Sequence, residues 1–200
     1  MMFAVEAIAV ILALAYLVLA ARESLLCWYC AFASSALYVV VMWDARLLTE
    51  AALQIFYMGM AVVGWYQWRH GHRSAGMPLQ IVSLQWWHHV VLLALLMLLT
   101  YVNGWVMQSY TTAAFPFVDA FIAWGSVITT VLVIRKVLEN WLYWVLFDGL
   151  AIFVYVNRGL YMTAVLFALY VVIVIFGYVR WLRVYRRQAA RAASQTPSAP

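Results

Sequence analysis

The chain has 200 residues, of which 68% are hydrophobic and 10% are charged, and its mean hydropathy is +0.93. A soluble domain is roughly half apolar and a quarter charged, so this composition excludes an ordinary soluble protein and indicates a chain that lies in a lipid bilayer. The net charge of +5 fits a basic edge beside anionic headgroups better than a nucleic-acid-binding surface.

Long apolar stretches follow one another along almost the whole chain. Each is close to the roughly 20 residues that a helix needs to cross a bilayer. Glu6 is the only early charge, so we read the first stretch as a retained span rather than a signal peptide. The sequence therefore predicts an all-α integral membrane protein of seven transmembrane helices. The predicted spans are residues 3–21, 24–43, 47–69, 79–102, 115–134, 138–156 and 159–181.

The basic residues are distributed unequally between the two ends of the predicted helices. All of the 12 Lys and Arg residues except Arg46 and Arg158 fall at the ends shared by helices one and two, three and four, and five and six, or in the C-terminal tail. The positive-inside rule then places the N-terminus outside and the C-terminus in the cytoplasm. We expect a multi-pass protein of a bacterial-type cytoplasmic (inner) membrane.

Two parts of the sequence resemble each other. The segments YMGMAVVGWYQW (57–68) and YVVIVIFGYVRW (170–181) share a Tyr, a Gly seven positions later and a final Trp. Upstream, ESLLCW (23–28) and ENWLYW (139–144) share Glu and Trp, and a three-residue difference in one loop aligns them. Helices one to three then correspond to helices five to seven around a spacer helix, which is a parallel 3+1+3 repeat. The predicted units are a three-helix bundle at 1–78, the linker helix at 79–102, a second bundle at 103–184 and a disordered cytoplasmic tail at 185–200.

The sixth predicted helix carries polar and aromatic residues on one face. Trp141, Trp144 and Asp148 follow the spacing i, i+3, i+7. A start near residue 138 puts Asp148 roughly 15 Å deep, where a carboxylate is costly unless it faces protein, water or a ligand. Two indoles beside a buried carboxylate suit a flat cationic ring. The alternative is an interfacial Trp belt with a structural Asp, and Trp141 fits that belt equally well.

The third predicted helix offers a second polar stripe. Gln54, Tyr57 and Trp65 recur at steps of three and four residues, and neutral groups of this kind suit hydroxyls or amides. Polar residues also join transmembrane helices to one another, which is the alternative role of Gln54. Trp68 and Trp181 each lie beside an Arg, and we interpret both as interfacial anchors.

Other motifs were considered for chemistry. Cys27 and Cys30 have the Cys-x-x-Cys spacing of a redox pair, so a non-transporting membrane thiol redox protein is an alternative, although two small apolar residues within a helix is the simpler reading. His88 and His89 are adjacent and do not suit one metal ion. We predict no metal, no cofactor, no nucleic-acid partner and no enzyme activity.

Several motifs together resemble a known family. FPFVDA (115–120), RKVLENWLYW (135–144) with an acidic residue four positions after the second Trp, and LQIFYMGMAVVGWYQW (53–68) are similar to the PnuC-type vitamin transporters. The resemblance implies a fold similar to that of the SWEET sugar transporters and facilitated uptake of a vitamin, usually nicotinamide riboside, which is then trapped by phosphorylation. It also implies a substrate site lined by Trp141, Trp144 and Asp148 with Gln54 and Tyr57 opposite; Trp65 and Asn140 complete the candidate set.

The sequence differs from the family's pattern at two places that bear on the identity of the substrate. Members that carry nicotinamide riboside commonly have Asn where this chain has Asp148, and an Asn in the second helix where it has only Ser34 and Ser35. A thiamine transporter of the same family is therefore the alternative, and both vitamins are cationic heteroaromatics. Membrane lipid and further copies of the chain are the other expected partners. We expect alternating access down the gradient, with proton coupling through Asp148 as the open alternative.

Overall fold

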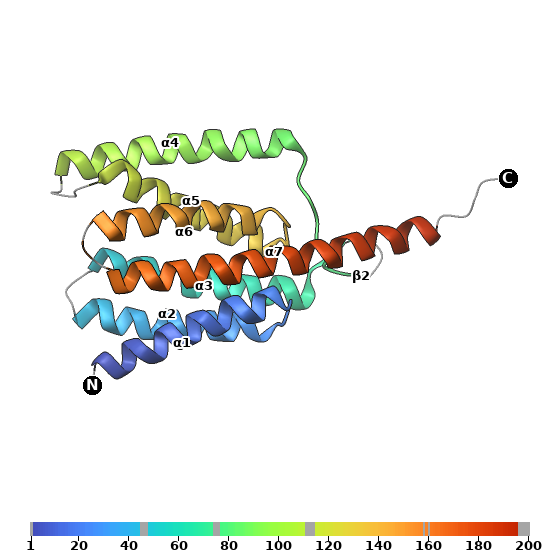
Figure 1. Ribbon diagram of the computed structural model, residues 1–200, viewed down its shortest axis with the longest axis horizontal. Coiled ribbons are helices and arrows are strands. Elements are labelled where there is room, and N and C mark those ends of the chain that lie inside the picture. Colours follow the sequence, from blue (N-terminus) through green and yellow to red (C-terminus); the bar gives the residue numbers. More distant parts are fainter. Residues whose placement is uncertain are drawn as a thin grey trace. The chain divides into compact units, whose positions relative to one another are not determined.

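The computed structural model describes residues 2–44, 48–73, 77–110, 115–157, 159 and 161–195. Within these ranges the chain forms seven α-helices and one pair of two-residue antiparallel strands (Figure 1). The helices are α1 (Met2–Ala21), α2 (Leu26–Asp44), α3 (Leu48–His70), α4 (Trp86–Tyr110), α5 (Pro116–Ile134), α6 (Asn140–Asn157) and α7 (Tyr161–Gln195), and the strands are β1 (His72–Arg73) and β2 (Met77–Pro78). The all-α architecture agrees with the prediction. Residues Arg46, Arg158 and 196–200, on which parts of the topology and tail predictions fall, lie outside the described ranges.

Five of the described helices are long and apolar enough to cross a membrane: α1, α2, α4, α5 and α7. In lipid, a helix satisfies its backbone hydrogen bonds internally, which explains why these runs are helical. The two remaining helices, α3 with 23 residues and α6 with 18, are not among these candidates. They are the two helices that carry the candidate site residues predicted from the sequence.

Helix α4 differs most from its prediction, since it covers Trp86–Tyr110 instead of 79–102. The preceding residues are extended and bond to the turn before α6. Val82 pairs with Val137 as a parallel bridge, and the backbone N–H of Leu138 donates to Val82 O at 2.7 Å. Apolar composition alone suggested a helix for this segment, but its backbone groups are used in a long-range contact.

Helix α7 is longer than predicted and continues to Gln195 rather than ending at 181. The segment 185–195, predicted as disordered, is helical. Its Ala and Arg residues are strong helix formers, so a composition that is poor in apolar residues extends the helix beyond the apolar part. The prediction of disorder for this segment was therefore wrong.

The described chain divides into two compact units. The first contains residues 1–81, 134–136 and 176–200, and the second contains 82–133 and 137–175. In the first unit α2 packs against both α1 and α3. A Cβ at Gly64 of α3 would overlap the ring of Trp28, so glycine allows this close approach. In the second unit a Cβ at Gly125 of α5 would overlap the ring of Phe147 from α6 in the same way.

The turns that end α1 and α5 share one backbone geometry. Glu23 has φ 55° and Lys136 has φ 52°, and each lies two residues beyond its helix. This left-handed conformation costs a non-glycine residue about 1–2 kcal/mol. Both turns are closed by the backbone bond between C″ and C3 of a Schellman motif. These bonds are Ser24 N to Leu19 O at 3.0 Å and Val137 N to Leu132 O at 2.9 Å.

The position of these turns revises the alignment of the two similar segments. Glu23 and Lys136 are 113 positions apart, which is also the separation of the repeated Tyr, Gly and Trp downstream. At this separation Trp28 corresponds to Trp141, and the two side chains are 2% and 1% exposed. The predicted pairing of Trp28 with Trp144 needed a loop difference, and the turn geometry makes that difference unnecessary.

Candidate functional site

The candidate site on α6 begins with two polar residues that have structural partners. The carboxylate of Glu139 accepts hydrogen bonds from the Ser83 hydroxyl and, at 3.2 Å, from the Leu84 backbone N–H. Asn140 is fully buried, and its Nδ2 donates to Val137 O at 2.6 Å. These bonds fix the start of α6. The amide of Asn140, predicted as a substrate contact, is thus partly used by the fold.

Asp148 is the central feature of α6. It is the ninth residue of an 18-residue helix, about 12 Å from the start at 1.5 Å per residue. Its side chain is 6% exposed, yet it has no hydrogen bond or ion pair to any other described residue. A buried ionised carboxylate without a partner costs several kcal/mol, and such groups within membrane helices are typically functional.

The two Trp residues of α6 differ in how far they are buried. Trp141 is 1% exposed, so it belongs to the core and not to an interfacial belt. Trp144, one turn before Asp148, is only half-buried. After Asp148, a side chain added at Gly149 would meet no atom within 4 Å. Trp144 thus lies one turn from Asp148 on the same face of α6 and is partly accessible, whereas the open space at Gly149 faces about 100° away around the helix.

Neighbouring helices of the second unit pack against the adjoining face of α6, about 100° around the helix from Trp144 and Asp148. The Phe147 ring packs beside Phe121 of α5, with 5.5 Å between ring centroids. The Tyr143 hydroxyl lies 2.8 Å from Nδ1 of His89 in α4. Tyr143 and His89 were not linked by the sequence analysis, because a contact across 54 positions leaves no local pattern. Rigid support of this kind favours a preformed binding face.

The predicted residues of α3 lie in the first unit. Gln54 and Tyr57 are both half-buried. Nε1 of Trp65 donates to the Tyr29 hydroxyl at 2.9 Å, and Cζ of Arg69 lies 5.1 Å from the centroid of the Trp65 ring. Trp65 is thus bonded within its own unit instead of being available on a stripe with Gln54.

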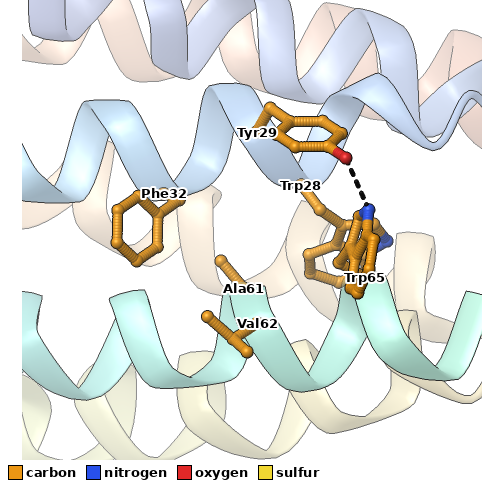
Figure 2. Close-up of a pocket in the computed structure, with 6 residues that line it drawn as sticks. All are labelled: Trp28, Tyr29, Phe32, Ala61, Val62 and Trp65. Atoms are coloured by element: carbon orange, nitrogen blue, oxygen red, sulfur yellow. Dashed lines mark hydrogen bonds between the residues drawn. The ribbon is translucent and has the colours of Figure 1, made fainter.

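Trp65 also lines a cavity of about 310 Å³ between α2 and α3 (Figure 2). The walls are aromatic and aliphatic, and the hydrogen bond from Trp65 to Tyr29 crosses one end. Tyr29 and Val62 are more than half exposed, so this hollow opens onto an outer apolar face. The lining residues are Trp28, Tyr29, Phe32, Ala61, Val62 and Trp65.

Trp68 and Trp181 are not interfacial anchors. Trp181 is fully buried, and its Nε1 donates to Ala20 O at 3.1 Å. Nε1 of Trp68 donates to Ile134 O at 3.2 Å. Both indoles join helix ends that are far apart in the sequence, and the adjacent Arg residues gave a misleading signal.

The thiols and imidazoles form no chemical centre in the described part of the chain. Cys27 is buried and Cys30 half-buried, and both are free thiols of α2. No group of three or more His, Cys, Asp or Glu side chains there is arranged to hold a metal ion.

These features define a class: a multi-pass, all-helical membrane protein with a carboxylate that is buried halfway along a helix and has no partner among the described residues. The model of the nicotinamide mononucleotide transporter family matches residues 4–183. The chain belongs to this family of transporters.

Curated relatives agree in length and differ in substrate. The nicotinamide riboside transporter PnuC of Escherichia coli (strain K12) is 22% identical over 217 residues, which cover 95% of this chain and 90% of the relative. The riboflavin/roseoflavin transporter RibM of Streptomyces davaonensis is 25% identical over 190 residues, covering 94% and 89%. Both relatives are transporters and neither is an enzyme, which confirms the prediction that this protein is not one.

The fold is similar to a solved structure. The crystal structure of the vitamin B3 transporter PnuC matches with a TM-score of 0.72 at 20% identity, over 92% of this chain and 82% of that chain. This likeness supports the helical fold.

Proposed function

We propose that the protein takes up a cationic heteroaromatic vitamin, with nicotinamide riboside as its first candidate, across a bacterial inner membrane. The observation that carries this proposal is the carboxylate of Asp148, which is buried in the middle of α6 with no partner among the described residues. The pyridinium of nicotinamide riboside is a flat cation, so it supplies the charge that Asp148 lacks and a ring that Trp144 can stack on.

Gln54 and Tyr57 of α3 are proposed as neutral hydrogen-bonding groups for the ribose hydroxyls. Both are half-buried, and neither needs a second charge to donate and accept. Trp141 and Asn140 are proposed as supports at the start of α6, since their side chains are buried.

The proposed mechanism is alternating access in a parallel 3+1+3 fold similar to that of SWEET transporters. Support comes from the constant separation of 113 positions between the two turns, the two buried Trp residues of α2 and α6 and the repeated Tyr, Gly and Trp of α3 and α7. Helices one to three and five to seven then form related bundles that open the site alternately to the two sides. The distribution of Lys and Arg supports an outside N-terminus.

Riboflavin and thiamine are the competing substrates. RibM is named for riboflavin, whose ring is uncharged, whereas thiamine is cationic and fits Asp148 as well as nicotinamide riboside does. The test is uptake of each labelled vitamin by liposomes that contain purified protein, with empty liposomes as the control. We expect saturable uptake of nicotinamide riboside that does not depend on a pH gradient. Faster uptake of riboflavin would contradict the proposed role of the carboxylate, and accumulation that follows the pH gradient would replace uniport by proton coupling.

A further inference from the structure

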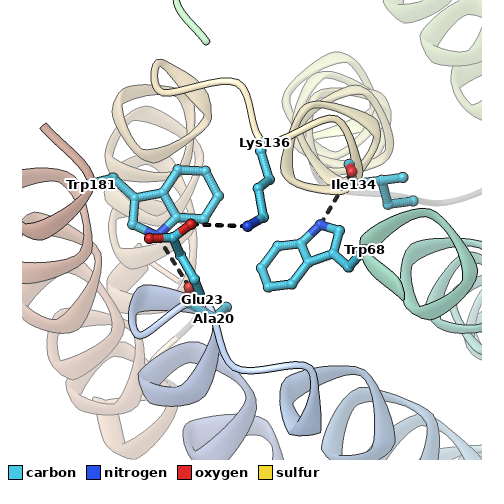
Figure 3. Close-up of polar contacts among 6 residues, drawn as sticks. All are labelled: Ala20, Glu23, Trp68, Ile134, Lys136 and Trp181. Atoms are coloured by element: carbon cyan, nitrogen blue, oxygen red, sulfur yellow. Dashed lines mark hydrogen bonds and ion pairs between the residues drawn. The ribbon is translucent and has the colours of Figure 1, made fainter. Parts of the chain in front are cut away.

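Four side chains of the first compact unit meet where α1 and α5 end (Figure 3). Nζ of Lys136 and Oε2 of Glu23 are 2.9 Å apart, and the two side chains are 12% and 22% exposed. Nζ of Lys136 also lies 4.8 Å from the centroid of the Trp68 ring. The rings of Trp68 and Trp181 have centroids 6.2 Å apart. The cation is thus held between a carboxylate and an indole face, in a setting with little water.

The two indoles bond in a reciprocal manner. Trp68, near the end of α3, donates to the carbonyl of Ile134 at the end of α5. Trp181, at the corresponding position of α7, donates to the carbonyl of Ala20 near the end of α1. Carbonyls in the last turn of a helix have no partner within that helix. Trp68 satisfies the carbonyl of Ile134, whereas Trp181 shares the carbonyl of Ala20 with the backbone N–H of Glu23, which donates to it at 3.0 Å. Each indole thus joins the third helix of one repeated segment to the first helix of the other.

Glu23 and Lys136 occupy backbone positions that favour glycine. Their φ values of 55° and 52° are left-handed, and glycine would adopt them without the steric cost that other residues have. Instead both positions carry charged residues of opposite sign, and these two residues are ion-paired with each other. The pairing of their side chains offers a physical reason why neither position is glycine.

We propose that Glu23, Lys136, Trp68 and Trp181 form a latch that holds one end of the transporter closed and must separate when the substrate leaves on that side. The proposal rests on the alternating-access function above, and the distribution of basic residues assigns the latch to the cytoplasmic side.

The chemistry of the latch suits a contact that opens and closes repeatedly. It consists of one ion pair, one cation–π contact and two hydrogen bonds at helix ends. Each is worth on the order of a tenfold change or less in an equilibrium, so water can replace them at modest cost. Loss of one member should therefore shift the population toward the open state without unfolding the helices.

Cys27 provides a reporter within the chain. It is fully buried in the first turn of α2, four positions after Glu23, so it should react with N-ethylmaleimide only when the latch opens. In a Cys30→Ser background, Lys136→Gln and Glu23→Gln should each raise the alkylation rate of Cys27 about fivefold. Arg135→Gln removes the same charge at the adjacent exposed position and should leave the rate unchanged.

The exchange of charges separates the latch from general loosening of the fold. The double variant Glu23→Lys with Lys136→Glu rebuilds the ion pair in reverse, and slow alkylation of Cys27 should return. If both single variants label at the parent rate, or if the double exchange labels as fast as the singles, the latch is not the closing contact. The assay uses purified protein with no vitamin present, so its outcome does not depend on which substrate is carried. An absence of transport in liposomes would instead contradict the proposed function, and it would not change the alkylation rates of Cys27 that test the latch.

Discussion

Helices α2 and α6 occupy corresponding places in the sequence, yet they use their buried polar residues differently. At the separation of 113 positions Ser35 of α2 corresponds to Asp148 of α6, and the two are 9% and 6% exposed. In α2, the neighbouring Ser34 donates to the backbone carbonyl of Ala9 in α1 at 2.8 Å. In α6 the carboxylate of Asp148 has no such partner among the described residues. One helix uses a buried polar group for packing, whereas the other leaves a charged group available.

This difference supports the proposed role of α6 in substrate recognition. A hydroxyl bonded to a carbonyl of its own unit stabilises the helix pair by about 1 kcal/mol and recognises nothing else. A carboxylate held in a rigid, mostly dry position attracts a cation far more strongly than it would in water. We propose that α6 provides the charge selectivity of the transporter, and substitutions in the two helices should then have different consequences.

The largest expected effect comes from Asp148→Asn, which keeps the shape of the side chain and removes its charge. Loss of one member of a buried charge pair costs about 2–4 kcal/mol, so the affinity for nicotinamide riboside should fall about 30- to 1,000-fold. Titration by tryptophan fluorescence measures it. Ser35→Ala at the corresponding position of α2 is the control and should change the affinity less than about threefold. Equal losses in the two variants would remove the distinction between the helices.

The next effect concerns the half-buried indole one turn before the carboxylate. Trp144→Ala should lose about 1–3 kcal/mol of ring stacking, which corresponds to a roughly five- to hundredfold weaker affinity for nicotinamide riboside. Isothermal titration calorimetry measures the dissociation constants. Trp105→Ala in α4 removes an indole that is 54% exposed and should leave binding unchanged. An unaltered affinity in Trp144→Ala would show that the ring stacks elsewhere.

A smaller effect is expected on stability rather than on binding. Ser34→Ala removes the bond to Ala9 and should lower the free energy of unfolding by about 1 kcal/mol, with the vitamin affinity unchanged. Thermal or denaturant unfolding of the purified variant in detergent gives the first quantity, and the fluorescence titration gives the second. A variant of normal stability with weaker binding would mean that α2 contributes to the site directly.

The smallest effect is expected for the thiols of α2. Replacing Cys27 and Cys30 together by Ala should leave most of the uptake activity in liposomes, because a transporter needs neither thiol for chemistry. We expect the initial rate of uptake to stay within about twofold of the parent's, because replacing Cys by Ala changes the buried volume only slightly. Complete loss of activity in a folded double variant would revive the redox alternative.

Local patterns in the sequence were sufficient to predict most helices and the polar face of α6. Apolar runs of about 20 residues have few alternatives in lipid, and the spacing of Trp144 and Asp148 places them on one side of a helix. The predictions that were wrong concern residues that make contacts with distant parts of the sequence. Because Val82 pairs with Val137, α4 begins later than its apolar composition predicts. Trp181 is buried and donates a hydrogen bond to Ala20, which is 161 positions away, so its neighbouring Arg did not indicate its role.

The ion pair of Glu23 and Lys136 was missed for a related reason. These residues follow the ends of α1 and α5 at the same distance, but that symmetry is visible only when the two halves are aligned without a gap. A match between two Glu residues, Glu23 and Glu139, pointed to a different alignment. Glu139 is occupied by Ser83 and Leu84, so the shared residue type did not reflect a shared role.

We propose that Asp148 pairs with the positive charge of the vitamin. The most direct test compares nicotinamide riboside with its dihydro form, which has nearly the same shape and no charge on the ring, on the parent protein and on Asp148→Asn. We expect the parent to bind the cation at least about tenfold more tightly than the neutral form, and this ratio of affinities to fall to about one in the variant. An unchanged ratio in a folded Asp148→Asn protein would contradict the assignment of this carboxylate.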